Sequence, residues 1–273
     1  MKHYEDKIYI YIILITFLSL GIAEILPTYI QYVIALLGIF SFGILHGSND
    51  LFVVEKLNKT HQQNQFLKSL FTYLGIVLAF VVIFYFLPLF ALVAFVLISG
   101  YHFGEQHFHS KISNQGSKAV VLFYLSYGLF VLFLLLYFNL EEVIIIIKDM
   151  TGYQVPKLIF SYSLTFTFIS SGIFYYVNSR QNEVLNHAIL PNLIYIVLFS
   201  LLFYMNDVVW GFAVYFVLWH SIPSLKDQVN SLYGEFNLKN FIQYFKKAFP
   251  YWLASIVGMC VVVWLFHDTK HFF

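Results

Sequence analysis

Nine runs of mostly apolar residues, each close to the length that crosses a lipid bilayer, follow one another along this chain. A spanning α-helix needs about 20 predominantly apolar residues, and in lipid a helix satisfies its backbone hydrogen bonds within one segment. The runs cover residues 8–26, 30–47, 67–87, 88–104, 118–138, 157–177, 187–205, 207–223 and 249–267. Only 11% of residues are charged, against about 25% in soluble domains. We therefore predict an all-α, polytopic integral membrane helix bundle with about nine transmembrane helices (eight to ten), forming one domain over residues 1–273.

Turn residues separate several of these runs. Pro27 and Pro88 cannot continue a preceding helix, and Asn206-Asp207 favours a turn. The stretch 140–156 is too short to span, so we expect it to lie at the interface or to re-enter the membrane. Residues 224–248, with lysines among Phe and Tyr, predict an amphipathic surface helix.

The positive charges predict an orientation. Cytoplasmic loops of membrane proteins are enriched in Lys and Arg. With nine helices and a cytoplasmic N-terminus, only Lys148, Lys157 and Lys270 of the 15 basic residues fall outside. The net charge of +1 and the lack of a basic block give no reason to expect nucleic acid as a partner. Cys260, the single cysteine, excludes a disulfide framework and a cysteine-based zinc site.

Three histidines occupy the same end of three predicted helices. They are His46 in GILHGSND, His102 in SGYHFGEQHFH and His220 in FVLWHSIPS. On the predicted topology all three helices run inward, so the imidazoles lie at similar depth near the cytoplasmic face, as does His187 at the start of the seventh run. Ionisable side chains within a membrane are costly and usually functional. Together they suggest a metal site.

Carboxylates follow two of these histidines. Asp50 lies four residues after His46, and Glu105 lies three residues after His102. A carboxylate beside a ligating histidine commonly fixes its tautomer. The alternatives are a turn at a helix end for His46, a solvated loop for the histidines after residue 101, and a structural hydrogen bond for His220.

Several metals bind imidazole. Histidine suits zinc, copper, iron and nickel. A site without cysteine and with few carboxylates, next to lipid, fits non-haem iron acting on O₂ and an apolar substrate. Zinc hydrolysis fits less well, because its substrates are usually polar. The 32 Phe and 21 Tyr would suit a tunnel for a long polyene.

The motifs HGSND, YHFGEQ and FVLWHS resemble, in order and spacing, those of the Brp/Blh family of bacterial membrane β-carotene 15,15'-dioxygenases. The resemblance implies cleavage of β-carotene at its central double bond with O₂ to give two retinal molecules. It implies a multi-pass protein of the cell inner membrane with a functional link to a retinal-binding rhodopsin. By position, ferrous iron (Fe²⁺) would be held by His46, His102 and His220, and the acidic positions match Asp50 and Glu105.

One position departs from the family pattern. The family has H-S-P-x-H in the eighth helix, whereas this chain has His220-Ser-Ile-Pro-Ser224, so a hydroxyl replaces the fourth imidazole. The fourth ligand then comes from another histidine or from water, or the chain is a diverged member with altered or lost activity. The candidate histidines are His107, His109 and His187.

Two further classes of function remain open. A di-iron desaturase or hydroxylase of the histidine-box kind would need about eight histidines in H-x-x-H-H-like clusters, which this sequence matches only partly. A non-enzymatic carotenoid- or retinal-binding protein, or a transporter, would use the histidines for gating or packing. Metal content and oxygen consumption separate these classes.

Overall fold

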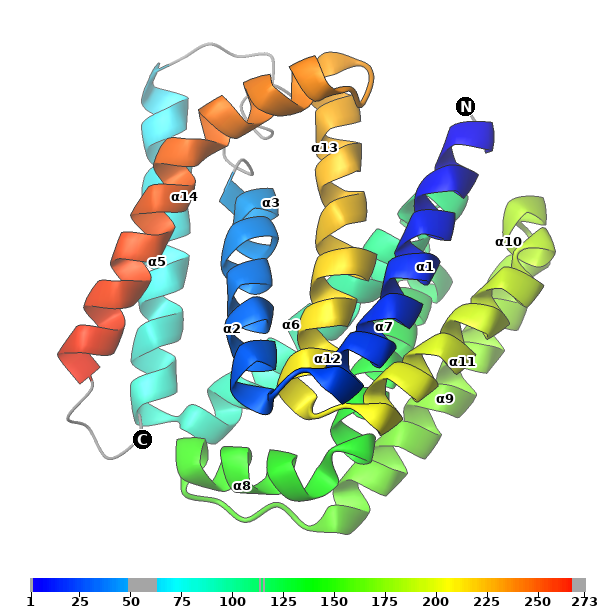
Figure 1. The fold of residues 1–273 in the computed structure, drawn as a ribbon, viewed down its shortest axis with the longest axis horizontal. Coiled ribbons are helices and arrows are strands. Elements are labelled where there is room, and N and C mark those ends of the chain that lie inside the picture. Colours follow the sequence, from blue (N-terminus) through cyan, green and yellow to red (C-terminus); the bar gives the residue numbers. More distant parts are fainter. Residues whose placement is uncertain (1, 49–62, 113, 115, 267–273) are drawn as a thin grey trace.

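Helices make up all of the regular structure that is described. The computed structural model describes residues 2–48, 63–112, 114 and 116–266, and within these ranges there is no strand (Figure 1). This confirms the all-α prediction. The elements are α1 (Lys2–Ile25), α2 (Thr28–Gly38), η1 (Ile39–Gly43), α3 (Ile44–Ser48), α5 (Gln63–Phe86), α6 (Pro88–Phe108), η2 (His109–Lys111), α7 (Lys118–Phe138), α8 (Leu140–Thr151), α9 (Lys157–Ser179), α10 (Glu183–His187), α11 (Ile189–Met205), α12 (Val208–Val214), η3 (Tyr215–Ser221), α13 (Ile222–Tyr233) and α14 (Leu238–Phe266).

Six helical stretches of the described chain are long and apolar enough to cross a membrane. They are Ile8–Ile25, Thr28–Ser48, Pro88–Lys111, Lys118–Phe138, Lys157–Ser179 and Val208–Tyr233. Gly75–Phe86 and Ile189–Met205 are shorter apolar helices. These helices fit a multi-pass membrane protein. The total of nine spans and the cytoplasmic N-terminus stay predictions.

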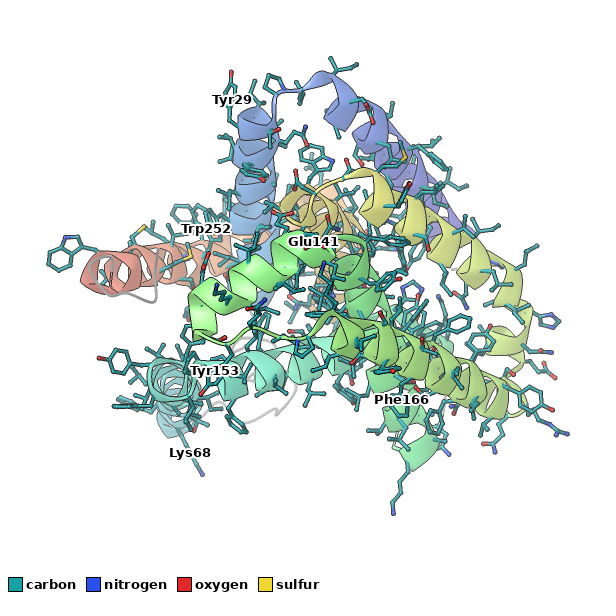
Figure 2. The ribbon with its side chains drawn as sticks, turned by 90° about the horizontal axis from the view of Figure 1, so that it is seen from below. Tyr29, Lys68, Glu141, Tyr153, Phe166 and Trp252 are labelled. Atoms are coloured by element: carbon teal, nitrogen blue, oxygen red, sulfur yellow. The ribbon has the colours of Figure 1, made fainter. Side chains whose placement is uncertain are left out.

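Large apolar side chains cover the outside of the bundle. Phe166 of α9 is 72% exposed and Tyr29 of α2 is 69% exposed, and both lie at the periphery in Figure 2. Soluble monomers rarely expose extended apolar surface. The outer surface therefore suits contact with lipid.

The predicted turns are confirmed. Helix α1 ends at Ile25 and α2 begins at Thr28, on either side of Pro27. Pro88 is the first residue of α6, where its missing N–H costs nothing. The Asp207 carboxylate accepts a hydrogen bond of 2.8 Å from the Trp210 N–H and so caps α12.

Two helices continue beyond their predicted ends. Helix α6 runs to Phe108 rather than 104, and the helical stretch that contains His220 runs to Tyr233 rather than 223. The polar residues after the histidines are paired between helices, since Gln106 Nε2 donates a hydrogen bond of 3.3 Å to Asp227 Oδ2. His102 and His220 therefore lie inside helices and not at their ends.

The predicted surface helix over 224–248 is wrong in its boundaries, because residues 224–233 belong to α13 and 238–248 begin α14. Residues 238–266 form the single helix α14, with Pro250 inside it. Tyr244 and Ala248 on this helix are fully buried, and they share a small core with Leu45 and Val229. By contrast, α8 lies across the ends of the long helices (Figure 1), an arrangement compatible with the predicted interfacial segment.

Glycines bring α6 and α7 into close contact around His102. A Cβ atom on Gly104 would lie 1.9 Å from the carbonyl oxygen of Tyr124, and one on Gly128 would lie 1.8 Å from that of Gly100. Glycines at this spacing let membrane helices approach backbone to backbone. Because Gly100 and Gly104 flank His102, this contact sets where His102 enters the bundle.

Candidate metal centre

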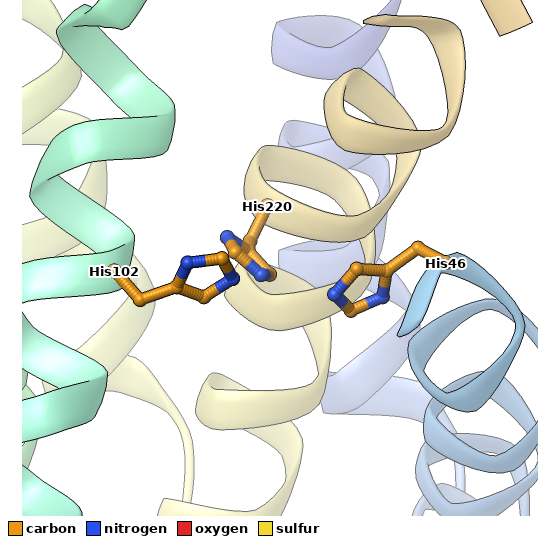
Figure 3. Close-up of side chains that lie close together, drawn as sticks. All are labelled: His46, His102 and His220. Carbon is orange, nitrogen blue, oxygen red and sulfur yellow. The ribbon is translucent and has the colours of Figure 1, made fainter. Parts of the chain in front are cut away.

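The three histidines meet between their helices, with His46 and His220 buried and His102 exposed. His46 comes from α3, His102 from α6 and His220 from η3, and their rings face one another in Figure 3. One ring nitrogen from each lies within 4.8 Å of the others. The ring centroid of His220 is 4.9 Å from that of His46 and 4.8 Å from that of His102. Residues from three distant parts of the chain thus form one imidazole cluster, which we call the histidine trio.

His220 is the buried centre of the trio. It is 2% exposed, and neither ring nitrogen has a hydrogen-bond partner among the described residues. Leaving a buried polar group without a partner costs about 1–3 kcal/mol. A cation bound by the imidazole would remove the cost at the coordinating nitrogen.

The hydrogen bond of His46 leaves one nitrogen free for a ligand role. Its Nδ1 lies 3.4 Å from the carbonyl oxygen of Phe42. When Nδ1–H donates to that carbonyl, Nε2 keeps its lone pair. Such backbone contacts commonly fix the tautomer of metal-binding histidines.

Two π-helical segments adjoin the trio. Segment η1 ends three residues before His46, and η3 contains His220. π-helical turns are rare and are frequent at functional sites. Neighbouring side chains bond to carbonyls in both segments, since Ser221 donates to Phe216 at 2.8 Å and the Trp252 indole donates to Phe40 at 2.7 Å. Hydropathy does not separate π-helix from α-helix, so the sequence analysis missed both segments.

Aromatic rings hold the His220 imidazole on two sides. Phe216 stacks on it at 5.4 Å between centroids, and Phe103 packs at 4.7 Å. Phe216 also contacts the His46 ring at 5.9 Å. Gly43 makes room for this ring, because a Cβ there would lie 2.5 Å from Phe216 Cε1. These residues were not among the predicted site residues, because an apolar residue in an apolar helix carries no distinguishing signal.

A family model described as Beta-carotene 15,15'-dioxygenase matches residues 37–272, which is more than half of the chain. The chain belongs to this family. The match confirms the resemblance drawn from the three motifs, and the matched region contains the whole trio. No curated protein and no solved structure matches the chain. Membership in the β-carotene 15,15'-dioxygenase family implies a carotenoid substrate and dioxygenase-like activity at the family level.

The trio fits a first-row transition metal of the kind that a dioxygenase of this family would need. An imidazole nitrogen lies about 2.1 Å from a bound ion, so three nitrogens around one tetrahedral ion lie about 3.4 Å apart. The trio nitrogens lie within 4.8 Å of one another, so the side chains would have to draw closer together to hold one ion. Three neutral imidazoles without thiolate suit iron, copper, nickel or zinc.

The predicted carboxylates have different outcomes. Glu105, one turn from Tyr101, accepts a hydrogen bond of 3.3 Å from the Tyr101 hydroxyl. No bond from Glu105 to a trio imidazole is seen in the described part of the chain, so its role in orienting an imidazole stays a prediction. Asp50 lies outside the described residues.

None of the proposed fourth ligands joins the trio. The buried His107 ring packs 5.3 Å from Tyr127. His109 lies in η2 and His187 ends α10, and both side chains are exposed. Within the described residues, the trio is the group of histidines and acidic residues close enough to hold an ion. Ser224, at the family position of the fourth histidine, is buried in α13.

Proposed function

We propose that this chain is a membrane-integral, non-haem iron dioxygenase that cleaves β-carotene at its central double bond to give two retinal molecules. The convergence of three imidazoles around the unpartnered nitrogens of His220 supports this proposal. Membership in the family supports the carotenoid substrate. We place the protein in the cell inner membrane, where the retinal would supply a retinal-binding rhodopsin.

His46, His102 and His220 would hold ferrous iron. When bound, this ion supplies the redox chemistry that lets O₂ react with an alkene. The two oxygen atoms of O₂ end on the two carbons of the broken double bond, so the reaction balances without an external reductant or proton. The chain therefore has to position the ion and the polyene and to exclude water, and it does not have to relay protons.

The residues around the trio suit these tasks. Phe103 and Phe216 pack against His220 and present flat apolar surface beside the imidazoles. His220 itself is shielded from solvent. An apolar site that excludes water protects reactive intermediates and orients a bound substrate.

The single trio favours one iron over the two of a histidine-box enzyme. That alternative requires a second set of histidines around a second ion. Among the described residues, one group of histidines lies within ligand distance, and it has three members. The iron content of the purified protein separates the two alternatives. One iron per chain supports the proposal, and two irons per chain would contradict it.

Pigment loss in living cells tests the activity. We expect expression in a β-carotene-producing bacterium to bleach the cells and to yield retinal. The variant His220→Ala, present in the membrane at the same level, should leave the pigment and give no retinal. Unchanged pigment with the unaltered chain, when the protein is present in the membrane and iron is supplied, would contradict the proposal. Protein that retains pigment without consuming oxygen would point to the binding or transport alternative.

A further inference from the structure

A second site lies away from the trio. A cavity of about 560 Å³ opens between α9 and α11, and residues of α7 form its floor. Its volume falls in the range of about 300–1,000 Å³ that is typical of small-molecule sites. No trio histidine lines it. Aromatic rings dominate the lining, among them Phe108, Phe123, Tyr127, Phe130, Phe168 and Tyr175.

Two polar groups in the lining of this cavity lack hydrogen-bond partners among the described residues. They are the Tyr127 hydroxyl and Asn192 Oδ1, on side chains 3% and 4% exposed. The other end of the Asn192 amide is used, since Nδ2 donates to the Tyr175 hydroxyl at 3.4 Å, and that hydroxyl donates to the Leu185 carbonyl at 2.7 Å. Both atoms have almost no accessible surface, and the His107 ring lies beside them, so a ligand oxygen reaches them when these wall side chains rotate.

The charges of the lining favour an uncharged ligand. The described residues that line the cavity include one basic and one acidic side chain, Arg180 and Glu183, both exposed, and Arg180 lies near the ring of Tyr176. The lining therefore carries no net charge. The titratable side chain beside Tyr127 and Asn192 is His107, which does not line the cavity. The lining contains no lysine, so an aldehyde bound there cannot form a Schiff base with it and would remain exchangeable.

We propose that this cavity binds an isoprenoid chain that ends in one uncharged oxygen group, an aldehyde or an alcohol. The Tyr127 hydroxyl donates to the ligand oxygen, and Asn192 Oδ1 accepts from the ligand when that oxygen carries a hydrogen. The aromatic lining packs against the chain. Since an apolar aldehyde is what the proposed cleavage releases, this inference rests on the proposed function and makes the cavity a holding site for its product.

Gly172 offers a way to fill the cavity without disturbing the fold. It lines the cavity, and a Cβ atom there would meet no atom within 4 Å. Gly258 on α14 is a matched control, because a Cβ there also meets nothing and Gly258 does not line the cavity. We therefore compare Gly172→Phe with Gly258→Phe. Tyr127→Phe removes only the proposed donor.

Binding of all-trans-retinal and all-trans-retinol to purified, chelator-treated protein tests the inference, with quenching of tryptophan fluorescence as the signal. We expect one saturable site per chain and an affinity that falls at least tenfold in Gly172→Phe, a few-fold in Tyr127→Phe and not at all in Gly258→Phe. The tighter of the two probes identifies the aldehyde or the alcohol as the ligand. Non-saturable uptake, equal affinity in Gly172→Phe, or tighter binding of retinoic acid than of both probes would overturn the inference.

The variant His220→Ala separates this inference from the proposed function. We expect it to bind retinal as the unaltered chain does, although it lacks a trio member. Loss of binding in His220→Ala, with the protein still monodisperse, would place the ligand at the trio and overturn the inference alone. Absence of carotene cleavage together with Gly172-dependent binding would instead contradict the proposed function and leave a site for apolar aldehydes or alcohols.

Discussion

At the scale of single residues, Ser224 decides how the trio differs from the family pattern. It lies four residues after His220 in a continuous helical stretch and is 6% exposed. Residues four apart share a helix face, so a side chain at this position is close to the turn that carries His220. Three imidazoles leave more coordination positions open than four, which favours access for O₂ at the expense of metal affinity.

The substitution Ser224→His should therefore strengthen metal binding. We expect an apparent dissociation constant for ferrous iron about tenfold lower, equivalent to about 1.4 kcal/mol. Anaerobic titration of the chelator-treated protein measures it. Ser224→Asn, a side chain of intermediate size without an imidazole, is the control and should not tighten binding. Weaker binding in Ser224→His than in the control would mean that the side chain at position 224 points away from the ion.

The residues of the trio could be predicted from sequence because their cost inside a membrane makes them conspicuous. His46, His102 and His220 are polar residues in apolar runs. Phe216 and Gly43 could not be predicted in the same way. Their importance arises from one contact between η1 and η3, where the missing Cβ of Gly43 admits the Phe216 ring. Such a contact becomes visible only when the two helices are placed together.

At the scale of helices, α14 holds the end of the helix that carries His46. The buried Tyr244 hydroxyl lies 3.3 Å from the Leu45 carbonyl oxygen and 3.4 Å from that of His46. It also lies 2.5 Å from Gln228 Oε1 on α13, the helix that follows His220. The hydroxyl has one hydrogen, so it joins both histidine-bearing stretches to α14 when the Gln228 amide is turned to donate to it and it donates to a carbonyl of Leu45 or His46. We infer that this arrangement positions His46.

Removing this hydroxyl should loosen the trio without removing a ligand. We expect Tyr244→Phe to weaken ferrous iron binding by about three- to tenfold, since a buried hydrogen bond contributes about 0.5–1.5 kcal/mol. Tyr251→Phe removes a hydroxyl from the same helix in a less buried place and should leave affinity unchanged. The visible absorption of the Co²⁺-substituted protein reports the ligand geometry directly. An unaltered Co²⁺ spectrum and unaltered iron affinity in Tyr244→Phe would show that α14 does not position His46.

Helix boundaries could be predicted where one residue terminates a helix by itself, and not where pairing between helices decides. Pro27, Pro88 and Asp207 act locally, through a missing N–H or a capping carboxylate. The part of α6 past residue 104 carries a hydrogen bond from Gln106 to Asp227, which are far apart in sequence. A hydropathy pattern treats both as polar and ends the segment early.

At the scale of the whole molecule, the trio is a cross-link between distant parts of the chain. Its histidines come from α3 (Ile44–Ser48), α6 (Pro88–Phe108) and η3 (Tyr215–Ser221), which are far apart in the sequence. An ion held there opposes separation of all three helices. Ligand binding to the folded state alone stabilises a protein by RT ln(1 + [L]/Kd), about 2.7 kcal/mol at 100 times Kd.

Iron should therefore raise the thermal stability of the purified protein, and a chelator should reverse the change. Heating in detergent under anaerobic conditions, followed by intrinsic fluorescence, measures the midpoint of unfolding. We expect several degrees of stabilisation by ferrous iron in the unaltered chain and none in His220→Ala. His107→Ala is the matched control. His107 on α6 is a buried imidazole like His220, but it lies outside the trio. That variant should melt earlier than the unaltered chain but keep the full increase with iron. An equal increase in His220→Ala and His107→Ala would place the ion elsewhere, because only a site that includes His220 makes the increase depend on that ring.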